Sequence, residues 1–342
     1  MHFSALQLDR AVGTIVASAA GDALGSQYEF GPALSDDITP EFGVGCFGHA
    51  RGEWTDDTSM AMPILQVLAA GRALEEVDAQ DEIVARWQEW SRTAKDVGTQ
   101  TRSVLAYLRT PTAASALARS EEVHRQTGRS AGNGSLMRTG PVALGYLDRS
   151  PEELAEAAAT VARLTHWEDD TADASALWCI AIRHAVLTGT LDMRAGLDWI
   201  PGDRRARWGE LIDEPLAAES HPRDFRQGNG WVVRAFQAAL SAVAGATSLH
   251  DAIERAVRGG GDTDTVAAIA GSLAGAVHGG SALPLSFTRV LYGWPGLRAS
   301  DLTRFAVLAA RHGRPPSPPA GQVADKADKI GALESGSDRE QW

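Results

Sequence analysis

Cysteine is nearly absent from this sequence, which has only Cys46 and Cys179 among its 342 residues. The two lie far apart and form no Cys-x-x-Cys pattern, so neither a disulfide framework nor a thiolate zinc site is indicated. The N-terminus has no basic start followed by an apolar run, and no stretch of about 18 uncharged apolar residues occurs. We therefore expect a cytoplasmic protein that is neither secreted nor embedded in a membrane.

Positive charge is also scarce. The 32 Lys and Arg residues stand against 44 Asp and Glu residues, which gives a formal net charge of -12. Such a charge repels phosphate groups, so it argues against broad electrostatic binding to duplex nucleic acid or to an anionic membrane.

The sequence lacks an obvious break between domains, because its 44% of hydrophobic residues are spread along most of its length. This distribution predicts one domain over residues 1–314, with a monomer as the default state. A chain of this length buries roughly 75% of the surface that its unfolded form exposes, so a metal is not needed for stability. Residues 315–342 begin with a proline cluster and then turn polar, which predicts a flexible tail.

Convincing alternation of apolar and polar residues, the pattern of a half-buried strand, is lacking as well. Apolar residues instead recur at helical spacing in many segments, including 12–19, 154–161, 232–243 and 302–309. Alanine-rich stretches such as LAEAAATVARL and AAIAGSLAGAV favour helix intrinsically. We predict an all-α fold, a single compact domain of many helices. Five tryptophans in helical patterns are expected in its core: Trp87, Trp90, Trp178, Trp199 and Trp208.

Two acidic junctions carry the sharpest chemical signal. Thr55-Asp56-Asp57-Thr58 precedes one helical apolar pattern, and Asp262-Thr263-Asp264-Thr265 precedes another, after three glycines. Asp and Thr commonly cap helices by accepting hydrogen bonds from free backbone N–H groups. A cap needs one side chain, however, and each junction offers two carboxyl and two hydroxyl groups within four residues.

Bound cations would resolve this excess of acid, since the nearby bases Arg51 and Arg258 offer little compensation. The side chains of both junctions are hard oxygen donors, without Cys or His, which favours Mg²⁺, Mn²⁺ or Ca²⁺ over Zn²⁺ or Cu²⁺. Four Asp and two or more Thr residues supply enough donors for two ions. An EF-hand is excluded, because it needs its acids within one twelve-residue loop.

The order of several motifs resembles that of a known family. GDALGSQYEF, GEWTDDTSMA, KDVGTQTR, GNGSLMR, TH before an alanine-rich helix, GWVVRAFQAAL and GGDTDTVAAIAGSLAGA follow one another as in the ADP-ribosylglycohydrolases, relatives of the dinitrogenase reductase-activating glycohydrolase. The resemblance runs from about Gly13 to Gly279, and the paired TDDT and GGDTDT motifs are highly specific together.

This resemblance implies an all-helical cleft with two Mg²⁺ or Mn²⁺ ions at its base, near the ribose of an ADP-ribose substrate. The implied metal ligands are Thr55, Asp56, Asp57, Asp262, Asp264 and Thr265. Glu29, Asp56 and Asp96 are the implied catalytic carboxylates, and choosing the general base among them needs geometry. The implied substrate contacts are Asn133, Gly134, Ser135, Met137 and His166, with the GNGS residues as candidates for the diphosphate.

Plainer interpretations stand beside these assignments. By themselves, Glu29 is typical of a surface residue after a turn, Asp96 of a loop or cap residue, GNGS of a tight turn, and His166 of a structural histidine. The sequence also departs from the family pattern at two places. The acidic insert 167–170 could alter the acceptor side of the cleft, and Pro63 could make the helix after TDDT start later or kink.

The favoured hypothesis is metal-dependent hydrolysis of the bond between C1″ of ADP-ribose and an acceptor, with an arginine guanidinium as the leading acceptor. One alternative is a catalytically silent relative that binds ADP-ribose or serves as a structural protein. Another is a two-metal phosphoesterase, which the ligand set alone permits. The sequence does not identify the acceptor, because its specificity lies in loops that sequence reasoning does not place.

Overall fold

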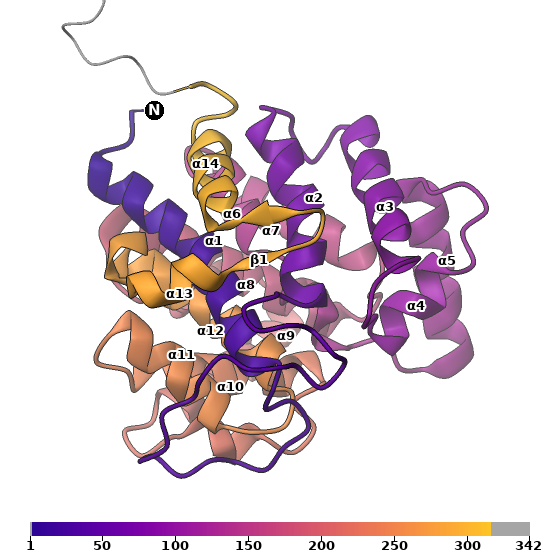
Figure 1. Ribbon diagram of the computed structural model, residues 1–342. Helices are drawn as coiled ribbons and strands as arrows, with labels where there is room; N and C mark the ends of the chain where they lie inside the picture. The colour runs from indigo at the N-terminus through magenta and orange to yellow at the C-terminus, as the bar shows by residue number, and fades with distance from the viewer. Residues whose placement is uncertain (1, 316–342) are drawn as a thin grey trace, which may run out of the picture.

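The computed structural model describes residues 2–315 and is built almost entirely from helices (Figure 1). Among these residues the only strands are β1 (Tyr292–Gly293) and β2 (Leu297–Arg298), which form one antiparallel pair. The predicted all-α fold is confirmed. The predicted tail, residues 315–342, lies outside the described residues except for Pro315. Within residues 2–315, no helix is long and apolar enough to cross a membrane.

The helices follow one another along the chain, and one long segment, residues 26–55, connects α1 to α2. The α-helices are α1 (Ala5–Gly25), α2 (Asp56–Ala69), α3 (Val77–Ser91), α4 (Thr99–Leu105), α5 (Ala113–Thr127), α6 (Gly140–Gly145), α7 (Pro151–Arg163), α8 (Asp169–Thr188), α9 (Gly202–Leu216), α10 (Val232–Ala244), α11 (Leu249–Arg258), α12 (Thr263–His278), α13 (Leu285–Val290) and α14 (Ala299–Ala310). The 3-10 helices are η1 (Asn133–Ser135), η2 (Arg194–Trp199), η3 (Pro222–Phe225) and η4 (Gly280–Ala282).

Helices α1 and α12 pack against each other so closely that their backbones touch. A Cβ atom on Gly275 of α12 would lie 2.1 Å from the carbonyl oxygen of Gly13, and one on Gly21 of α1 would lie 2.1 Å from that of Ala267. Every residue of α12 from Thr263 to Ala276 is buried, as its small-residue sequence leads one to expect. The small residues of α12 therefore allow its close contact with α1.

The same contact places one acidic junction beside the end of α1. A Cβ atom on Gly25, the last residue of α1, would lie 2.5 Å from the Cα atom of Asp264. The hydroxyl of Thr263 donates to the carbonyl oxygen of Gly25 over 2.8 Å. The first turn of α12 thus rests directly on the last turn of α1.

Helix α2 begins at Asp56 and continues through Pro63 to Ala69. The prediction that Pro63 makes this helix start later is therefore wrong. Proline in a helix interior removes one backbone hydrogen bond and costs about 3 kcal/mol. All residues of α2 except Gln66 are buried, so packing on nearly every side stabilises the helix against this loss.

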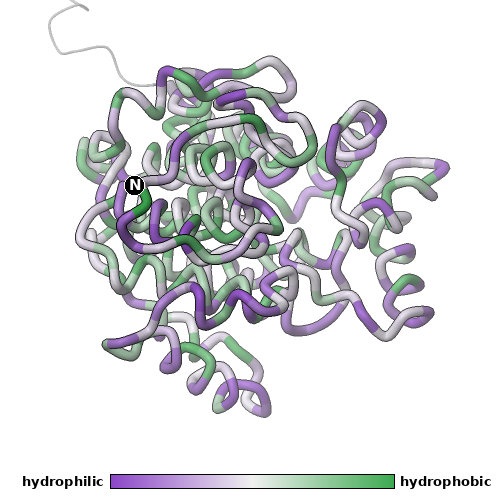
Figure 2. The backbone as a smooth tube through the Cα atoms, turned by 60° about the horizontal axis from the view of Figure 1, so that its bottom comes forward, coloured by the Kyte–Doolittle hydropathy of each residue, from purple (hydrophilic) through white to green (hydrophobic). Residues whose placement is uncertain are grey.

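The core follows the hydrophobic pattern with one exception among the predicted tryptophans. Trp87, Trp90, Trp178 and Trp208 are at most 3% exposed, whereas Trp199 is 38% exposed at the end of η2. The prediction for Trp199 is wrong, because it ends a short 3-10 segment in which only Gly196 is buried. Hydrophilic residues gather on the outer helices and loops, and the inner coils are mainly apolar (Figure 2).

Replacing Gly275 by Ala is expected to destabilise the protein by about 3 kcal/mol, because the new methyl group meets backbone atoms that cannot rotate away. Gly209, in the interior of α9, has no atom within 4 Å of an added Cβ. Gly209→Ala is thus the matched control, expected to gain about 0.5 to 1 kcal/mol from helix propensity. Urea unfolding measures both. A Gly275→Ala midpoint equal to wild type would contradict the close helix contact.

Candidate functional site

The two acidic junctions, more than two hundred residues apart in the chain, meet in space. Thr55 Oγ1 lies 3.4 Å from Asp264 Oδ2, and Thr265 Oγ1 lies 3.5 Å from Asp57 Oδ2. The first junction begins α2 and the second begins α12, so two helix N-termini converge on one cluster of oxygen atoms. Such termini favour negative charge, which partly offsets the crowding of the carboxylates.

Helix capping does not account for all of these side chains. Thr55 is the N-cap residue of α2 and Asp262 that of α12, yet neither side chain makes a capping hydrogen bond. Thr55 Oγ1 lies instead near Asp57 Oδ2 and Asp264 Oδ2. At the second junction, Asp264 Oδ1 accepts from the Thr265 N–H over 2.9 Å, so capping accounts for only part of this set of oxygen atoms.

Asp22 caps α2 from outside, and sequence reasoning missed it. Its carboxylate accepts from the Thr55 N–H and hydroxyl, both over 2.8 Å. It also accepts from the Thr58 N–H over 3.0 Å and from the Thr58 hydroxyl over 2.6 Å. In the sequence Asp22 stands as a single acid among small and apolar residues, and the structure buries it fully in the last turn of α1. Asp22 ties α1 to the first acidic junction.

Burial and mutual repulsion disturb the titration of this cluster. Burial first, then the charges of neighbouring carboxylates, raises the pKa values of Asp56, Asp57 and Asp264 well above their usual range. The same causes raise the pKa of Glu29 to about 9. Asp57 Oδ1 is buried without a hydrogen-bond partner among the described residues. A buried carboxylate of this kind needs a compensating positive charge.

The nearest predicted bases do not supply that charge. The Arg258 guanidinium donates to the carbonyl oxygen of Ile38 and to the carboxylate of Glu254, both over 2.7 Å. Arg51 is exposed. The donor set is made of carboxyl and hydroxyl oxygens, so it fits a hard divalent cation such as Mg²⁺, Mn²⁺ or Ca²⁺.

The carboxylates form two groups that share one member. Glu29, Asp262 and Asp264 each offer an oxygen within 4.8 Å of the others, and so do Asp22, Asp57 and Asp264. Each group could hold a divalent cation, and Asp264 belongs to both. This arrangement also places Glu29, predicted as catalytic, and Asp22, not predicted at all, among the groups able to hold a metal. Asp56 lies beside these groups and belongs to neither.

A cavity of about 1000 Å³ opens above the cluster. It is lined by most of the predicted residues, namely Glu29, Asp56, Asp96, Asn133, Gly134, Met137, His166, Asp262, Asp264 and Thr265. Thr55 and Asp57 lie outside this lining, and so does Ser135, which is fully buried and whose hydroxyl has no partner among the described residues. Its placement does not fit the predicted contact with phosphate.

Asn133 holds the second junction in place, in addition to lining the cavity. Its amide donates to Asp262 Oδ2 over 2.7 Å and to the carbonyl oxygen of Asn229 over 3.0 Å. Asn229, which sequence reasoning missed, accepts from the Asp262 N–H over 3.1 Å and donates to the carbonyl oxygen of Gly260 over 3.0 Å. These bonds fix the loop that carries Asp262.

Aromatic and basic residues complete the cavity wall. Phe30 and Phe47 pack edge to face with ring centres 6.0 Å apart, and Trp231 also lines the wall. All three are at least 41% exposed, which leaves their rings available for stacking. Arg102 and Arg129 line the wall as well. Sequence reasoning assigned none of these a role, because isolated aromatic residues in loops carry no periodic signal.

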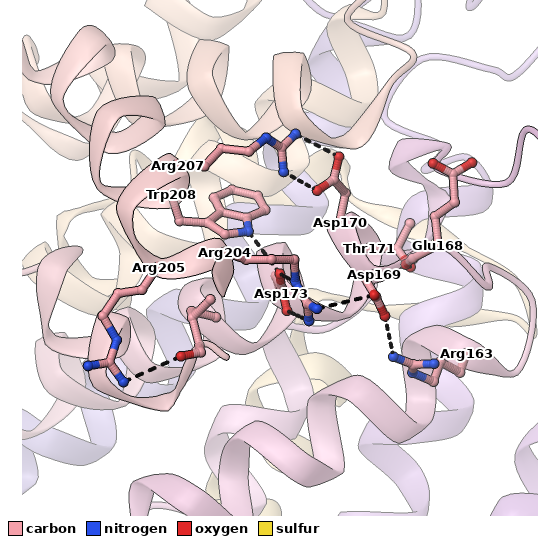
Figure 3. Close-up of polar contacts among 11 residues, drawn as sticks. Arg163, Glu168, Asp169, Asp170, Thr171, Asp173, Arg204, Arg205, Arg207 and Trp208 are labelled. Carbon is pink, nitrogen blue, oxygen red and sulfur yellow. Dashed lines mark hydrogen bonds and ion pairs between the residues drawn. The ribbon is translucent and has the colours of Figure 1, made fainter. Parts of the chain in front are cut away.

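The acids of the insert 167–170 differ in their contacts, because Asp169 and Asp170 face arginine side chains of α9 and Glu168 does not (Figure 3). Glu168 lines the cavity and accepts from the Ser130 N–H over 2.5 Å. Asp169 and Asp170 turn the other way and pair with Arg204 and Arg207 of α9. Of the three acids in this insert, only Glu168 lines the cavity.

Asp173, one turn further along α8, strengthens the same attachment (Figure 3). It accepts two hydrogen bonds from Arg204, over 2.6 and 3.0 Å, and a third from Trp208 Nε1 over 2.9 Å. Such two-pronged contacts with a buried carboxylate are strong and directional. They anchor the start of α8, and with it the segment that carries His166.

Comparison with known proteins agrees with this geometry. A family model described as ADP-ribosylglycohydrolase matches residues 4–317. The chain is 32% identical to an ADP-ribosylarginine hydrolase of Pseudomonas putida, over 81% of this chain and 72% of that protein. It is 28% identical to the ADP-ribosyl-[dinitrogen reductase] glycohydrolase of Rhodospirillum rubrum, over 81% and 88%. A solved structure titled ADP-ribosylglycohydrolase-related protein complex matches with a TM-score of 0.62 and 27% identity, over 90% of this chain and 99% of that one.

The carboxylate cluster predicts how stability depends on pH in protein treated with a chelator. Groups with raised pKa values hold protons in the folded state that the unfolded state releases, so stability falls as pH rises toward the folded pKa values. We expect the melting temperature to fall between pH 7 and 8.5. This window lies above the lowered pKa values of buried histidines such as His166, so their titration does not obscure that of the carboxylates. Mg²⁺ should raise it, and more so at pH 8.5, because metal competes with protons.

Asp264→Asn should remove most of this Mg²⁺ effect, since Asp264 belongs to both carboxylate groups. Asp198→Asn is the control, because the Asp198 side chain is 88% exposed and lies in η2. Differential scanning fluorimetry of wild type and both variants, with and without Mg²⁺ at each pH, measures the shift. An Mg²⁺ shift that is the same in the Asp264→Asn variant as in wild type would rule out this cluster as the metal site.

Proposed function

Because the chain belongs to the ADP-ribosylglycohydrolase family, we propose that it hydrolyses the glycosidic bond between C1″ of ADP-ribose and an acceptor, and releases ADP-ribose. The observation that carries this proposal is the convergence of the two distant junctions, because Thr55 Oγ1 lies 3.4 Å from Asp264 Oδ2 and both Asp56 and Asp264 line one large cavity. Oxygen ligands in such a place suit divalent cations next to a bound sugar.

The cavity offers a partner for each part of ADP-ribose. Its volume of about 1000 Å³ is at the upper end of ordinary ligand pockets and suits a dinucleotide-sized molecule. Exposed aromatic rings at Phe30, Phe47 and Trp231 suit the adenine. Arg102, Arg129 and the backbone of the GNGS segment suit the diphosphate, and the acidic base suits the terminal ribose.

Two Mg²⁺ or Mn²⁺ ions would be held by Thr55, Asp56, Asp57, Asp262, Asp264 and Thr265, with Glu29 and Asp22 close by. When bound, they supply positive charge that orients the ribose hydroxyls and stabilises the oxocarbenium-like transition state. Asp22 and Asn133 keep the ligands in place through the hydrogen bonds already given. The protein thus presents its carboxylates in a fixed arrangement, which lowers the cost of reorganisation.

Among the three predicted catalytic carboxylates, Asp96 is the best candidate to take the proton of the attacking water. It lines the cavity, is half-buried, and belongs neither to the predicted ligand set nor to the two carboxylate groups. Glu29 and Asp56 are more closely engaged with the cluster. The loop of Asp96 is held by Lys95, whose ammonium group donates to Glu53 Oε2 over 2.7 Å.

An arginine guanidinium is the proposed acceptor. Two relatives, from Pseudomonas putida and Serratia proteamaculans, are named as ADP-ribosylarginine hydrolases. An acidic cavity attracts a cationic acceptor, and Glu168 adds a carboxylate to its wall. We further propose that the protein acts as a monomer in the cytoplasm on ADP-ribosylated proteins or small guanidines, without strong binding to nucleic acid.

The proposed activity is tested by incubating the protein with Mg²⁺ and a panel of ADP-ribosylated acceptors, linked through arginine, serine or O-acetyl groups. We expect free ADP-ribose from the arginine linkage. Chelator or Asp264→Ala should lower the rate by about 10²- to 10⁴-fold, whereas Asp198→Ala should not. Release of inorganic phosphate would indicate a phosphoesterase instead. Tight binding of ADP-ribose without turnover of any acceptor would indicate a silent relative.

Asp96→Asn tests the choice of general base. The amide keeps the shape of the side chain but cannot take a proton at neutral pH, so kcat should fall by about 10²- to 10⁴-fold. The Mg²⁺-induced rise in melting temperature should persist, because Asp96 is outside the predicted ligand set. Steady-state kinetics and fluorimetry on the same preparation separate the two roles. A variant that keeps its kcat would exclude Asp96 as the base.

A further inference from the structure

A chain of buried polar groups runs from the interior to the cavity through three consecutive partners. Arg138 Nη2 donates to Thr165 Oγ1 over 2.6 Å, and Thr165 Oγ1 lies 2.7 Å from His166 Nδ1. Arg138 and Thr165 are fully buried, and His166 is 2% exposed. None of the proposed catalytic carboxylates is hydrogen-bonded to this chain, so it needs an explanation of its own.

The direction of the hydrogen bonds follows from the chemistry of arginine. A guanidinium has donors and no acceptor, so the oxygen of Thr165 must accept from Arg138. The hydroxyl has one proton, and His166 Nδ1 is its only further partner among the described residues. If Nδ1 carried a proton instead, the buried hydroxyl proton would have no acceptor. Nδ1 is therefore the acceptor, and the proton of a neutral imidazole is on Nε2.

Arg138 is held firmly enough to act as the fixed end of this chain. Its guanidinium carbon lies 4.2 Å from the centre of the Trp87 ring, and Nη2 also donates to the carbonyl oxygen of Val161 over 3.3 Å. Burial lowers the pKa of Arg138 to about 9, which still leaves it charged at neutral pH. Burial and the charge of Arg138 lower the pKa of His166 well below its usual value, so the imidazole is neutral.

The opposite edge of the imidazole faces the cavity beside the GNGS segment. A Cβ atom on Gly132 would lie 3.2 Å from His166 Nε2, and one on Gly134 would lie 3.3 Å from it. Both glycines and His166 line the cavity. The structure gives Nε2 no hydrogen-bond partner among the described residues. A donor in this position is available to a ligand.

We propose that Arg138 and Thr165 are positioning residues, which hold His166 as the tautomer protonated on Nε2, so that it donates one hydrogen bond to an oxygen of bound ADP-ribose. The proposal rests on the proposed function for the identity of the ligand. It gives the arginine of GNGSLMR and the threonine before His166 a role that neither the metal site nor the catalytic carboxylates supply. It also means that His166 does not serve as a base in the ligand-free protein.

The tautomer is measured directly in the full-length protein with Mg²⁺, without any variant. Two-bond nitrogen–proton correlation spectra of histidine labelled with ¹⁵N distinguish a protonated from an unprotonated ring nitrogen. Loss of one signal set in His166→Gln assigns the residue. We expect Nδ1 unprotonated and Nε2 protonated at pH 7.5. An imidazolium, or a proton on Nδ1, would overturn the proposal even if every variant of Thr165 failed to fold.

Thr165→Val tests the link to Arg138, because it removes the hydroxyl and keeps the shape. We expect the His166 tautomer to lose its preference for Nε2 and the dissociation constant of ADP-ribose to rise about tenfold, measured by calorimetry. Thr165→Ser should restore both. Thr14→Val, which removes another fully buried threonine hydroxyl on α1, should change neither. An unchanged tautomer in folded Thr165→Val would contradict the proposed link.

These outcomes are separable from those of the proposed function. If ADP-ribose binds and the tautomer is as expected, but no acceptor is hydrolysed, the proposed activity fails and the positioning role stands. If hydrolysis is observed and His166 carries its proton on Nδ1, the positioning role fails alone.

Discussion

The contact between α1 and α12 is the constraint on which the site depends. Glycine at Gly13, Gly21 and Gly275 lets two backbones touch, and this contact brings the last turn of α1 against Asp264. The carboxylates gather there although burial and repulsion oppose it, as their raised pKa values show. The large apolar core offsets that cost, so local instability is concentrated where cations can relieve it.

Asp22 turns this proximity into a defined geometry. Because four hydrogen bonds from Thr55 and Thr58 end on one carboxylate, the start of α2 is fixed relative to α1. Asn133 and Asn229 do the same for the loop of Asp262. The acidic junctions are therefore supported by side chains that lie outside the predicted set of metal ligands. Support of this kind decides how precisely ligands are placed.

The sequence was sufficient for the helical fold and for the two junctions, for identifiable physical reasons. Apolar residues at helical spacing reveal buried helix faces directly, and four carboxylates at two junctions exceed what capping can use. Neither Asp22 nor Asn229 could be found in this way. A single polar residue in a helix or turn has many ordinary explanations, and its partners are distant in sequence. Ser135 shows the reverse case, since a motif residue proved to be buried away from the cavity.

Contacts between residues far apart in the sequence also explain the other differences between the predictions and the structure. Phe30 and Phe47 belong to the segment between α1 and α2, Trp231 directly precedes α10, and only the folded chain shows that the three share one wall. Trp199 fits a helical pattern, yet the segment forms a short 3-10 turn at the surface. Periodicity tells which face of a helix is apolar, but it does not tell whether that helix forms or which element covers it.

The division of charge within the cavity follows from the same physics. Its base is rich in carboxylates that can hold divalent cations. A charged imidazolium in the wall would compete with those cations for the carboxylates. A neutral histidine avoids this competition and still offers a hydrogen-bond donor. Arg138 favours the neutral form because its positive charge lies near the ring. Thr165 accepts a hydrogen bond from Arg138 and donates one to His166 Nδ1. Negative charge at the base and a neutral imidazole in the wall are thus compatible parts of one site.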